Sequence, residues 1–174
     1  MKPVLMIHEV TDWMFDLPLE DYTLTFDDGL YTQYLYLDKI KEINTEKIFF
    51  ISTGIVADEK AYQCKNFINC YNAHEYFLNT GDAKHYMNWS QIKDIHKTDK
   101  CMIGGHSHNH NHIDIKNIIK DTRLMMTAFH KQNIAPIDFC FPFNEEHNIY
   151  KAHLRNTGFR NFYGNDRVDI DELY

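Results

Sequence analysis

The sequence predicts a single α/β domain in which helices pack outside a largely parallel sheet. The chain has 174 residues, which is the size of one domain and enough to bury a core. Apolar residues make up 44% of it and charged residues 25%, as in an ordinary globular protein. Short apolar runs alternate with amphipathic stretches, and this alternation is typical of parallel sheets. Because no repeat or Pro/Gly-rich linker interrupts it, we expect residues 1–174 to form one domain.

The predicted strands are short and rich in aromatic or branched residues. They cover 3–7, 22–26, 47–52, 101–103, 137–141 and 159–163. The predicted helices lie between these strands and carry apolar residues at helical spacing. They cover 30–43, 89–96, 115–130 and 145–156, and the glycine of Thr157-Gly158 ends the last one. Ligands in such folds bind beyond the carboxyl ends of the strands, so the residues after each strand are candidates for a site.

One segment, residues 57–87, fits the alternation poorly because it is polar and aromatic. We interpret it as an insertion over one edge of the sheet. Segments of this kind often shape a substrate cleft, but a plain surface excursion explains the composition equally well.

Composition also bears on partners and location. The formal charge of −7 and the scattered basic residues argue against nucleic-acid binding. No apolar run approaches the roughly 20 residues of a membrane span, so none is expected. The four cysteines show no CxxC spacing, and the first residues carry no export signal. Free thiols in the cytoplasm are the simplest interpretation, although a chain lacking its leader would look the same.

Three polar motifs directly follow predicted strands. The first is Thr25-Phe26-Asp27-Asp28-Gly29. Its adjacent carboxylates repel each other unless a cation or hydrogen bonds offset their charge. Gly29 allows a sharp turn, and a surface Asp-Gly turn is the alternative interpretation.

The second motif, residues 104–112, contains four histidines in seven residues after two glycines. Neutral imidazoles are good ligands for zinc and similar metals. His106/His110 and His108/His112 are both i, i+4 pairs, so spacing leaves the choice of ligands open. An accidental histidine-rich loop or an artificial tag would also produce such a run.

The third motif, Phe139-Cys140-Phe141-Pro142-Phe143-Asn144, is an apolar strand broken by proline. Phe141, Pro142 and Phe143 could line a substrate pocket, and backbone N–H groups near the strand end could hold an oxyanion. A buried strand leaving the core would look similar.

Together these residues resemble the polysaccharide deacetylase family, also described as the NodB-homology domain or carbohydrate esterase family 4. Thr25-Phe26-Asp27-Asp28-Gly29 matches its first motif, and His106-Ser107-x-x-His110 matches its second. Phe139-Cys140-Phe141-Pro142-Phe143 looks like its third, in the branch reading F-A-Y-P-[FY]. Weaker similarities at 5–10, 87–92 and 158–160 keep the same order, so the resemblance spans nearly the whole chain.

The resemblance implies a distorted, incomplete (β/α) barrel of the NodB-homology type. It implies that Asp28, His106 and His110 bind one divalent metal ion, zinc first and cobalt, nickel, manganese or iron as alternatives. Asp27 would be the general base, and the backbone N–H of Phe141 would help the metal to stabilise the oxyanion. His108 and His112 would then lie at the lip of the site or behind the ligands.

The sequence departs from the family in two places. Cys140 stands where the third motif often has an arginine that orients the catalytic aspartate. The late histidine that serves as general acid is absent, because no histidine follows His153. An amide leaving group needs a proton, so we expect a substitute. His147 is the first candidate and His8 the second.

The expected function is that of a cytoplasmic, metal-dependent carbohydrate N-deacylase. Its substrate would be an N-acylated amino sugar or sugar intermediate in surface-polysaccharide metabolism, for example a nucleotide- or lipid-linked one, with acetyl or formyl as the acyl group. The chain stops earlier than a complete family domain, and an open barrel edge would favour a homodimer. Two alternatives are an extracellular polysaccharide or peptidoglycan deacetylase lacking its leader, and a degenerate metal-containing carbohydrate-binding module without turnover.

Overall fold

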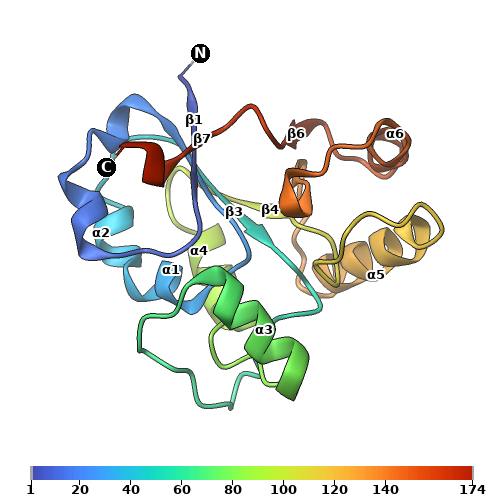
Figure 1. Ribbon diagram of the computed structural model, residues 1–174, viewed down its shortest axis with the longest axis horizontal. Helices are drawn as coiled ribbons and strands as arrows, with labels where there is room; N and C mark the ends of the chain where they lie inside the picture. Colours follow the sequence, from blue (N-terminus) through green and yellow to red (C-terminus); the bar gives the residue numbers. More distant parts are fainter. Residues whose placement is uncertain (1, 174) are drawn as a thin grey trace.

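The computed structural model describes residues 2–173, which form one seven-stranded sheet with helices around it (Figure 1). The strands are β1 (Val4–Ile7), β2 (Thr23–Phe26), β3 (Lys47–Ile51), β4 (Cys101–Gly105), β5 (Asp138–Cys140), β6 (Asn161–Tyr163) and β7 (Val168–Asp169). The α-helices are α1 (Tyr31–Leu35), α2 (Leu37–Ile40), α3 (Cys70–Thr80), α4 (Trp89–His96), α5 (Ile118–Lys131) and α6 (Asn148–Asn156). Short 3-10 helices cover Asp12–Asp16, Leu19–Asp21, Pro142–Asn144 and Ile170–Leu173.

The strand order is β6-β5-β4-β3-β2-β1-β7, and every neighbouring pair is parallel. Only residues 164–167 separate β6 and β7, which are the two opposite edges of the sheet. That connection reaches at most about 17 Å, whereas the edges of a flat sheet of this size would lie about 29 Å apart. The sheet must therefore curl, and the result is a distorted, incomplete barrel, as the sequence predicts.

All six predicted strands are present, as are helices in the four predicted helical segments. The segment 30–43 forms two short helices rather than one, because the backbone at Tyr36 (φ −97°, ψ 9°) leaves the helical range. The strand β7 was not predicted, since two residues are too few to show an alternating pattern. The helix α3 was not predicted either, because its polar sequence shows little amphipathic pattern.

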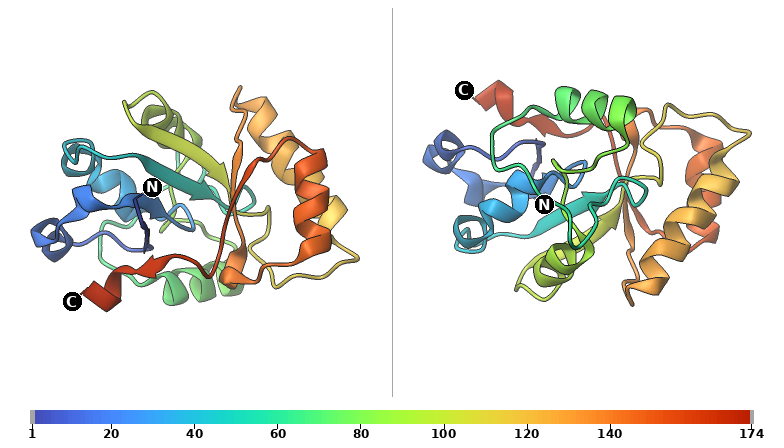
Figure 2. Two further views of the ribbon diagram at one scale, coloured as in Figure 1. Left: turned by 90° about the horizontal axis from the view of Figure 1, so that it is seen from above. Right: turned by 90° about the horizontal axis from the view of Figure 1, so that it is seen from below.

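Aromatic packing holds the sheet to its helices. The rings of Phe26 and Phe49 stack at 4.5 Å between β2 and β3. The ring of Phe139 on β5 meets those of Phe141, Tyr150 and Phe159 edge-on at 5.2–5.4 Å. Such offset and edge-to-face contacts add to the hydrophobic stabilisation. Figures 1 and 2 show α5 and α6 side by side at one end of the molecule, with α1 and α2 at the other.

The segment 57–87 contains α3, which begins at an asparagine cap and ends at a glycine. The Asn69 side chain accepts the Asn72 N–H at 2.8 Å, and Gly81 adopts φ 72° after the last turn. An antiparallel bridge between Tyr86 and Leu30 ties the end of the segment to the residue before α1. The segment therefore crosses the carboxyl edge of the sheet as an ordered element.

Within residues 2–173, no helix combines the length and apolar character needed to cross a membrane.

Candidate metal centre

Two of the polar motifs meet at the carboxyl edge of the sheet. The strand β2 ends at Phe26, and Asp27 and Asp28 follow it directly. The strand β4 ends at Gly105, and His106 follows it. Because β2, β3 and β4 are parallel neighbours, both motifs emerge at the same edge.

Unusual backbone geometry aims these residues at one another. Asp28 and Gly29 have φ angles of 70° and 76°, in the left-handed region that aspartate tolerates better than most residues and glycine adopts freely. On β4, a Cβ at position 104 would lie 2.5 Å from the ring of Phe50, so only glycine fits there. The turn after β2 and the close packing of β4 bring the two motifs into contact.

Asp28, His106 and His110 form a buried cluster of three potential metal ligands. The Asp28 Oδ1 atom lies 3.1 Å from His106 Nε2 and 2.9 Å from His110 Nε2, and all three donor atoms lie within 4.8 Å of one another. Ligand atoms that share an ion at about 2.0–2.2 Å are separated by comparable distances. Although burial opposes ionisation of Asp28, the two histidines hold its pKa well below the usual range, so it is a carboxylate.

The ring of His106 is oriented for ligation by the backbone. Its Nδ1 lies 2.9 Å from the carbonyl oxygen of Cys140, a pure acceptor, so Nδ1 carries the proton. The lone pair of Nε2 then faces Asp28 and His110. Two imidazole nitrogens, one carboxylate oxygen and an outer hydrogen bond of this kind suit a catalytic zinc site, in which one position stays open for water or substrate. The residues present therefore fit a divalent ion.

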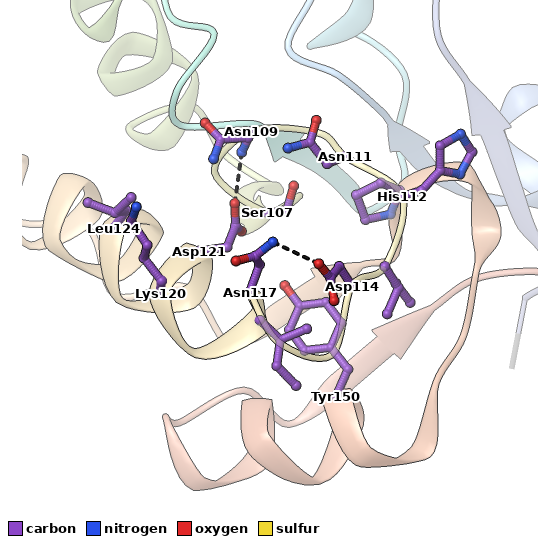
Figure 3. Close-up of a pocket in the computed structure, with 13 residues that line it drawn as sticks. Ser107, Asn109, Asn111, His112, Asp114, Asn117, Lys120, Asp121, Leu124 and Tyr150 are labelled. Atoms are coloured by element: carbon purple, nitrogen blue, oxygen red, sulfur yellow. Dashed lines mark hydrogen bonds between the residues drawn. The ribbon is translucent and has the colours of Figure 1, made fainter.

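The loop carrying these histidines is held by α5. Ser107 and His110 have φ angles of 64° and 51°, and the Ser107 Oγ accepts the His110 N–H at 2.9 Å. The Asp121 carboxylate accepts the backbone N–H groups of His108 at 2.7 Å and Asn109 at 3.1 Å. Figure 3 shows Asp121 reaching up from α5 to Asn109, at one side of a second, polar cavity of about 260 Å³. The loop adopts this strained path because Asp121 satisfies its N–H groups.

The other two histidines of the run turn away from the cluster. The ring of His108 bonds the Thr53 hydroxyl at 2.8 Å. His112 bonds the Glu145 carboxylate at 2.8 Å and stacks on Phe143 at 4.0 Å. The structure thus selects the His106/His110 pair and places His108 behind the loop and His112 at the rim.

Asp27 is bound by an arginine that the sequence analysis did not identify. Arg167 Nη1 donates to Asp27 Oδ1 and Arg167 Nη2 donates to Asp27 Oδ2, each at 2.8 Å, and both side chains are buried. Arg167 also donates to the Asn144 side chain at 2.8 Å and contacts the Cys140 sulfur at 3.0 Å. Burial opposes ionisation of Asp27, but Arg167 outweighs it and lowers the pKa, so Asp27 is charged at neutral pH.

The cluster opens into a cavity of about 530 Å³. Its walls come from β1, the motif loops, α3 and the segment after β5, and they comprise Met6, His8, Asp27, Asp28, Cys70, Tyr71, His74, Glu75, Leu78, Asn79, His106, His110, Phe141, Phe143 and Asn144. His74, to which no site role was assigned from the sequence, packs its ring against His110 at 4.7 Å. The segment 57–87 therefore shapes the cleft through α3, which is the first of its two interpretations.

The two candidate acids occupy different environments. His8 follows β1, lines the cavity, and places its Nε2 4.0 Å from Asp27 Oδ2. Burial disfavours the charged ring of His8, but the carboxylates of Asp28, Asp27 and Glu9 outweigh it and raise its pKa. His147 is not among the cavity residues, because its Nδ1 accepts the Ile149 N–H at 3.2 Å as the cap of α6. The structure brings His8, and not His147, to the cluster.

The third motif lines the cavity, but one of its predicted roles is wrong. Phe141 and Phe143 both contribute to the cavity wall, and Pro142 lies beside them, against the second cavity. The backbone N–H of Phe141 donates to the Tyr163 carbonyl at 3.0 Å in the β5–β6 ladder. It is therefore not free to bind an oxyanion. Sheet pairing, which the sequence motif does not reveal, takes this donor.

Neither a scan of protein-family models nor a search of curated proteins finds a match to this sequence. Solved structures do match. IcaB from Ammonifex degensii superposes with a TM-score of 0.69 at 17% identity, covering 97% of this chain and 84% of that one. A de-N-acetylase from Aggregatibacter actinomycetemcomitans gives 0.63 at 13% identity, covering 93% and 77%. The Streptococcus pyogenes deacetylase PplD, in complex with acetate, gives 0.63 at 15% identity, covering 91% and 80%.

This chain has the polysaccharide deacetylase fold. The coverage leaves few residues outside the common core, so the NodB-type barrel predicted from the sequence is confirmed. Within a polysaccharide deacetylase fold, the positions of Asp27, Asp28, His106 and His110 at the carboxyl ends of β2 and β4 are those expected from the sequence motifs.

The same fold explains the departure at Cys140. The sulfur atom of Cys140 lies 3.4 Å from Asp27 Oδ2. Arg167, in the connection between β6 and β7, supplies the guanidinium group that binds this carboxylate. Only four arginines occur in the sequence, so the missing motif arginine could have directed attention to them. Arg167 itself lies outside any motif, and only the crossing of residues 164–167 between the sheet edges reveals its contact.

Proposed function

We propose that this chain is a metal-dependent carbohydrate N-deacylase of the polysaccharide deacetylase family. The observation that carries the proposal is the buried Asp28, His106 and His110 cluster with Asp27 beside it, opening into a cleft. Asp28, His106 and His110 would hold one divalent ion, zinc by preference for its imidazole and carboxylate donors. When bound, the ion lowers the pKa of a water molecule and polarises the acyl carbonyl.

Asp27 acts as the general base in this scheme. Arg167 fixes both of its oxygens and keeps it ionised, so it is ready to take the proton of the attacking water. Asp28, one residue away, is committed to the two histidines. Two neighbouring carboxylates thereby take different roles because their partners differ.

His8 is the proposed general acid. Its ring lines the cavity close to Asp27, and its raised pKa favours the protonated form. A protonated imidazole at this place can deliver a proton to the departing amine. The arginine and the acid that the sequence lacks at their usual family positions thus both have substitutes, which argues against a degenerate binding module.

The cavity favours an uncharged amino sugar over a phosphorylated one. None of the residues that line it is lysine or arginine, while Glu75 and the two aspartates are acidic. A nucleotide or lipid diphosphate group would meet no cationic partner there. Exposed rings at the rim, Tyr71 on α3 and Phe143 stacked on His112, offer apolar faces for sugar rings. We therefore propose an N-acetyl or N-formyl amino sugar within a neutral glycan.

Metal content and amine release test this function together. Purified wild-type protein and His106→Ala would be compared by elemental analysis, and both would be incubated with N-acetyl- and N-formyl-glucosamine oligomers. Stoichiometric metal in the wild type only, with metal-dependent release of amine, is the expected result. Metal without release from either sugar would instead support a binding module, and absence of metal would refute the site.

The remaining parts of the proposal are cytoplasmic location and a homodimer. Fractionation of the native cells and the mass of the purified protein in solution test them. A protein found only outside the cell would favour the extracellular deacetylase.

A further inference from the structure

Asp28 belongs to a second group of potential metal ligands, and this group includes no residue of the histidine loop. His8, Asp28 and Cys70 place one donor atom each within 4.8 Å of one another. Cys70 is the first residue of α3, and both it and His8 are partly exposed in the cavity. This group shares only Asp28 with the Asp28, His106 and His110 cluster.

The protein holds His8 and Cys70 together through Glu9. The carboxylate of Glu9, next to His8 at the end of β1, accepts the backbone N–H of Cys70. This bond connects the residue after His8 to the first residue of α3. The pairing does not depend on the His106 loop.

The donor chemistry suits a soft divalent ion. A thiolate, an imidazole and a carboxylate form a ligand set typical of zinc. Asp28 has two oxygen atoms and can bind one ion through each, as carboxylates do in two-metal sites. Asp28, Asp27 and Glu9 outnumber Arg167 among the charged groups that act on His8, and a cation would offset that excess.

We propose that His8, Asp28 and Cys70 form a second, weaker zinc site whose occupancy inhibits hydrolysis. The inhibitory part rests on the proposed function, because a bound ion would take the lone pair of His8 and prevent it from delivering a proton. Zinc would then activate at the first equivalent and inhibit in excess. Binding releases the Cys70 thiol proton and, from protonated His8, the ring proton to solvent, and no oxidant or reductant is required.

Titration of the metal-free protein with cobalt(II) tests the site without reference to turnover. Cobalt bound by a thiolate gives a near-ultraviolet charge-transfer band, and the group of Asp28, His106 and His110 contains no sulfur. Cys140 does lie within 4.8 Å of donor atoms of Asp27 and His106, but a band from Cys140 would persist in Cys70→Ser. We expect the band to appear after the first equivalent in the wild type and to be absent in Cys70→Ser. Cys64→Ser is the matched control, since Cys64 lies in the same segment but outside the cavity lining.

Two further variants separate this proposal from the proposed function. His106→Ala should lose the first binding phase and keep the thiolate band. His8→Ala should weaken half-saturation of the band by more than about tenfold, since losing even an outer partner of a ligand costs roughly that much. A wild-type titration with no thiolate band, or a band unchanged in Cys70→Ser, would overturn the second site.

The inhibitory role is read from activity at excess zinc divided by activity at one equivalent, within each variant. This ratio should be low in the wild type and in Cys64→Ser, and close to one in Cys70→Ser. A thiolate band with a ratio near one in the wild type would refute inhibition.

Discussion

Arg167 binds both carboxylate oxygens of Asp27, a residue 140 positions earlier in the chain, at 2.8 Å each. The pair is buried and bidentate, and bidentate pairs are among the strongest charge-assisted contacts in proteins. It connects the last strand of the sheet to the proposed catalytic base. The C-terminal segment therefore contributes a side chain directly to the candidate site.

Replacement of Arg167 by methionine should destabilise the fold by about 3–5 kcal/mol, because Asp27 would remain as an unpaired buried charge. The pKa of Asp27 is lowered in the folded state, so its contribution is complete above its unfolded value, near 3.9, and is lost as the pH falls through the folded value. The stability difference from wild type should therefore be largest at neutral pH and shrink in acid. Urea unfolding at several pH values measures it.

Arg160→Met is the control for this variant, because Arg160 is an exposed arginine seven positions earlier. In the double variant Asp27→Asn/Arg167→Met, much of the lost stability should return. Equal losses in the single and double variants would contradict the buried-charge explanation.

His8→Ala should lower kcat by about 10²- to 10⁴-fold, the usual contribution of a general acid. His147→Ala should retain wild-type kcat, since that ring caps α6 away from the cavity. Steady-state kinetics on an N-acetyl-glucosamine oligomer, with one metal equivalent bound, compares the two. A larger loss in His147→Ala than in His8→Ala would reverse the assignment.

Asp121→Ala should weaken metal binding by about 10- to 100-fold, as removal of groups that orient ligands does. The mechanism is indirect, because Asp121 holds the backbone of the loop before His110 and does not reach the ion. Competition with a coloured chelator gives the affinity. Asp114→Ala is matched to it, since Asp114 lines the same second cavity but bonds Lys116 and Asn117 instead. Equal affinities in the two variants would refute the role of Asp121.

Removal of the metal by a chelator should abolish nearly all hydrolysis and lower the melting temperature. An ion that binds only the folded state, at 100 times its Kd, stabilises it by about 2.7 kcal/mol. Addition of one equivalent of zinc to the stripped protein should restore both properties in the wild type, whereas hydrolysis should stay abolished in His106→Ala. Full activity after complete removal would contradict the scheme.

Phe143→Ala should raise KM for an oligosaccharide by about 2- to 12-fold with little change in kcat, since one stacked aromatic contact is worth about 0.5–1.5 kcal/mol. Phe143 is half-exposed at the rim and stacks on His112. Phe67→Ala, which removes an exposed ring outside the cavity lining, should leave KM unchanged. A fall in kcat alone would show that Phe143 acts on the chemistry and not on binding.

Much of the fold could be read from local patterns. The apolar runs of β1 to β6 and the helical spacing of α4, α5 and α6 are properties of a few neighbouring residues, so they are visible in the sequence. The same is true of the motif from Thr25 to Gly29 and of the His106/His110 spacing. These short signals placed the proposed ligands and the base at the ends of the correct strands.

Contacts between distant segments required the tertiary structure. Arg167 reaches Asp27 only because residues 164–167 cross between the two edges of a curled sheet. His8 displaces His147 as the candidate acid because β1 lies next to β2 in the sheet. The Phe141 N–H is unavailable because β6 pairs with it.

Motif and periodicity therefore defined the elements and the first ligands, since these depend on residues close in sequence. Sheet curvature and strand pairing determined the partners of those residues, because a long-range contact leaves no mark on the local pattern. The cleft wall formed by α3 likewise depends on long-range contacts. The polar sequence of α3 does not indicate which side of the helix faces the cavity, and its packing over the carboxyl edge of the sheet decides this.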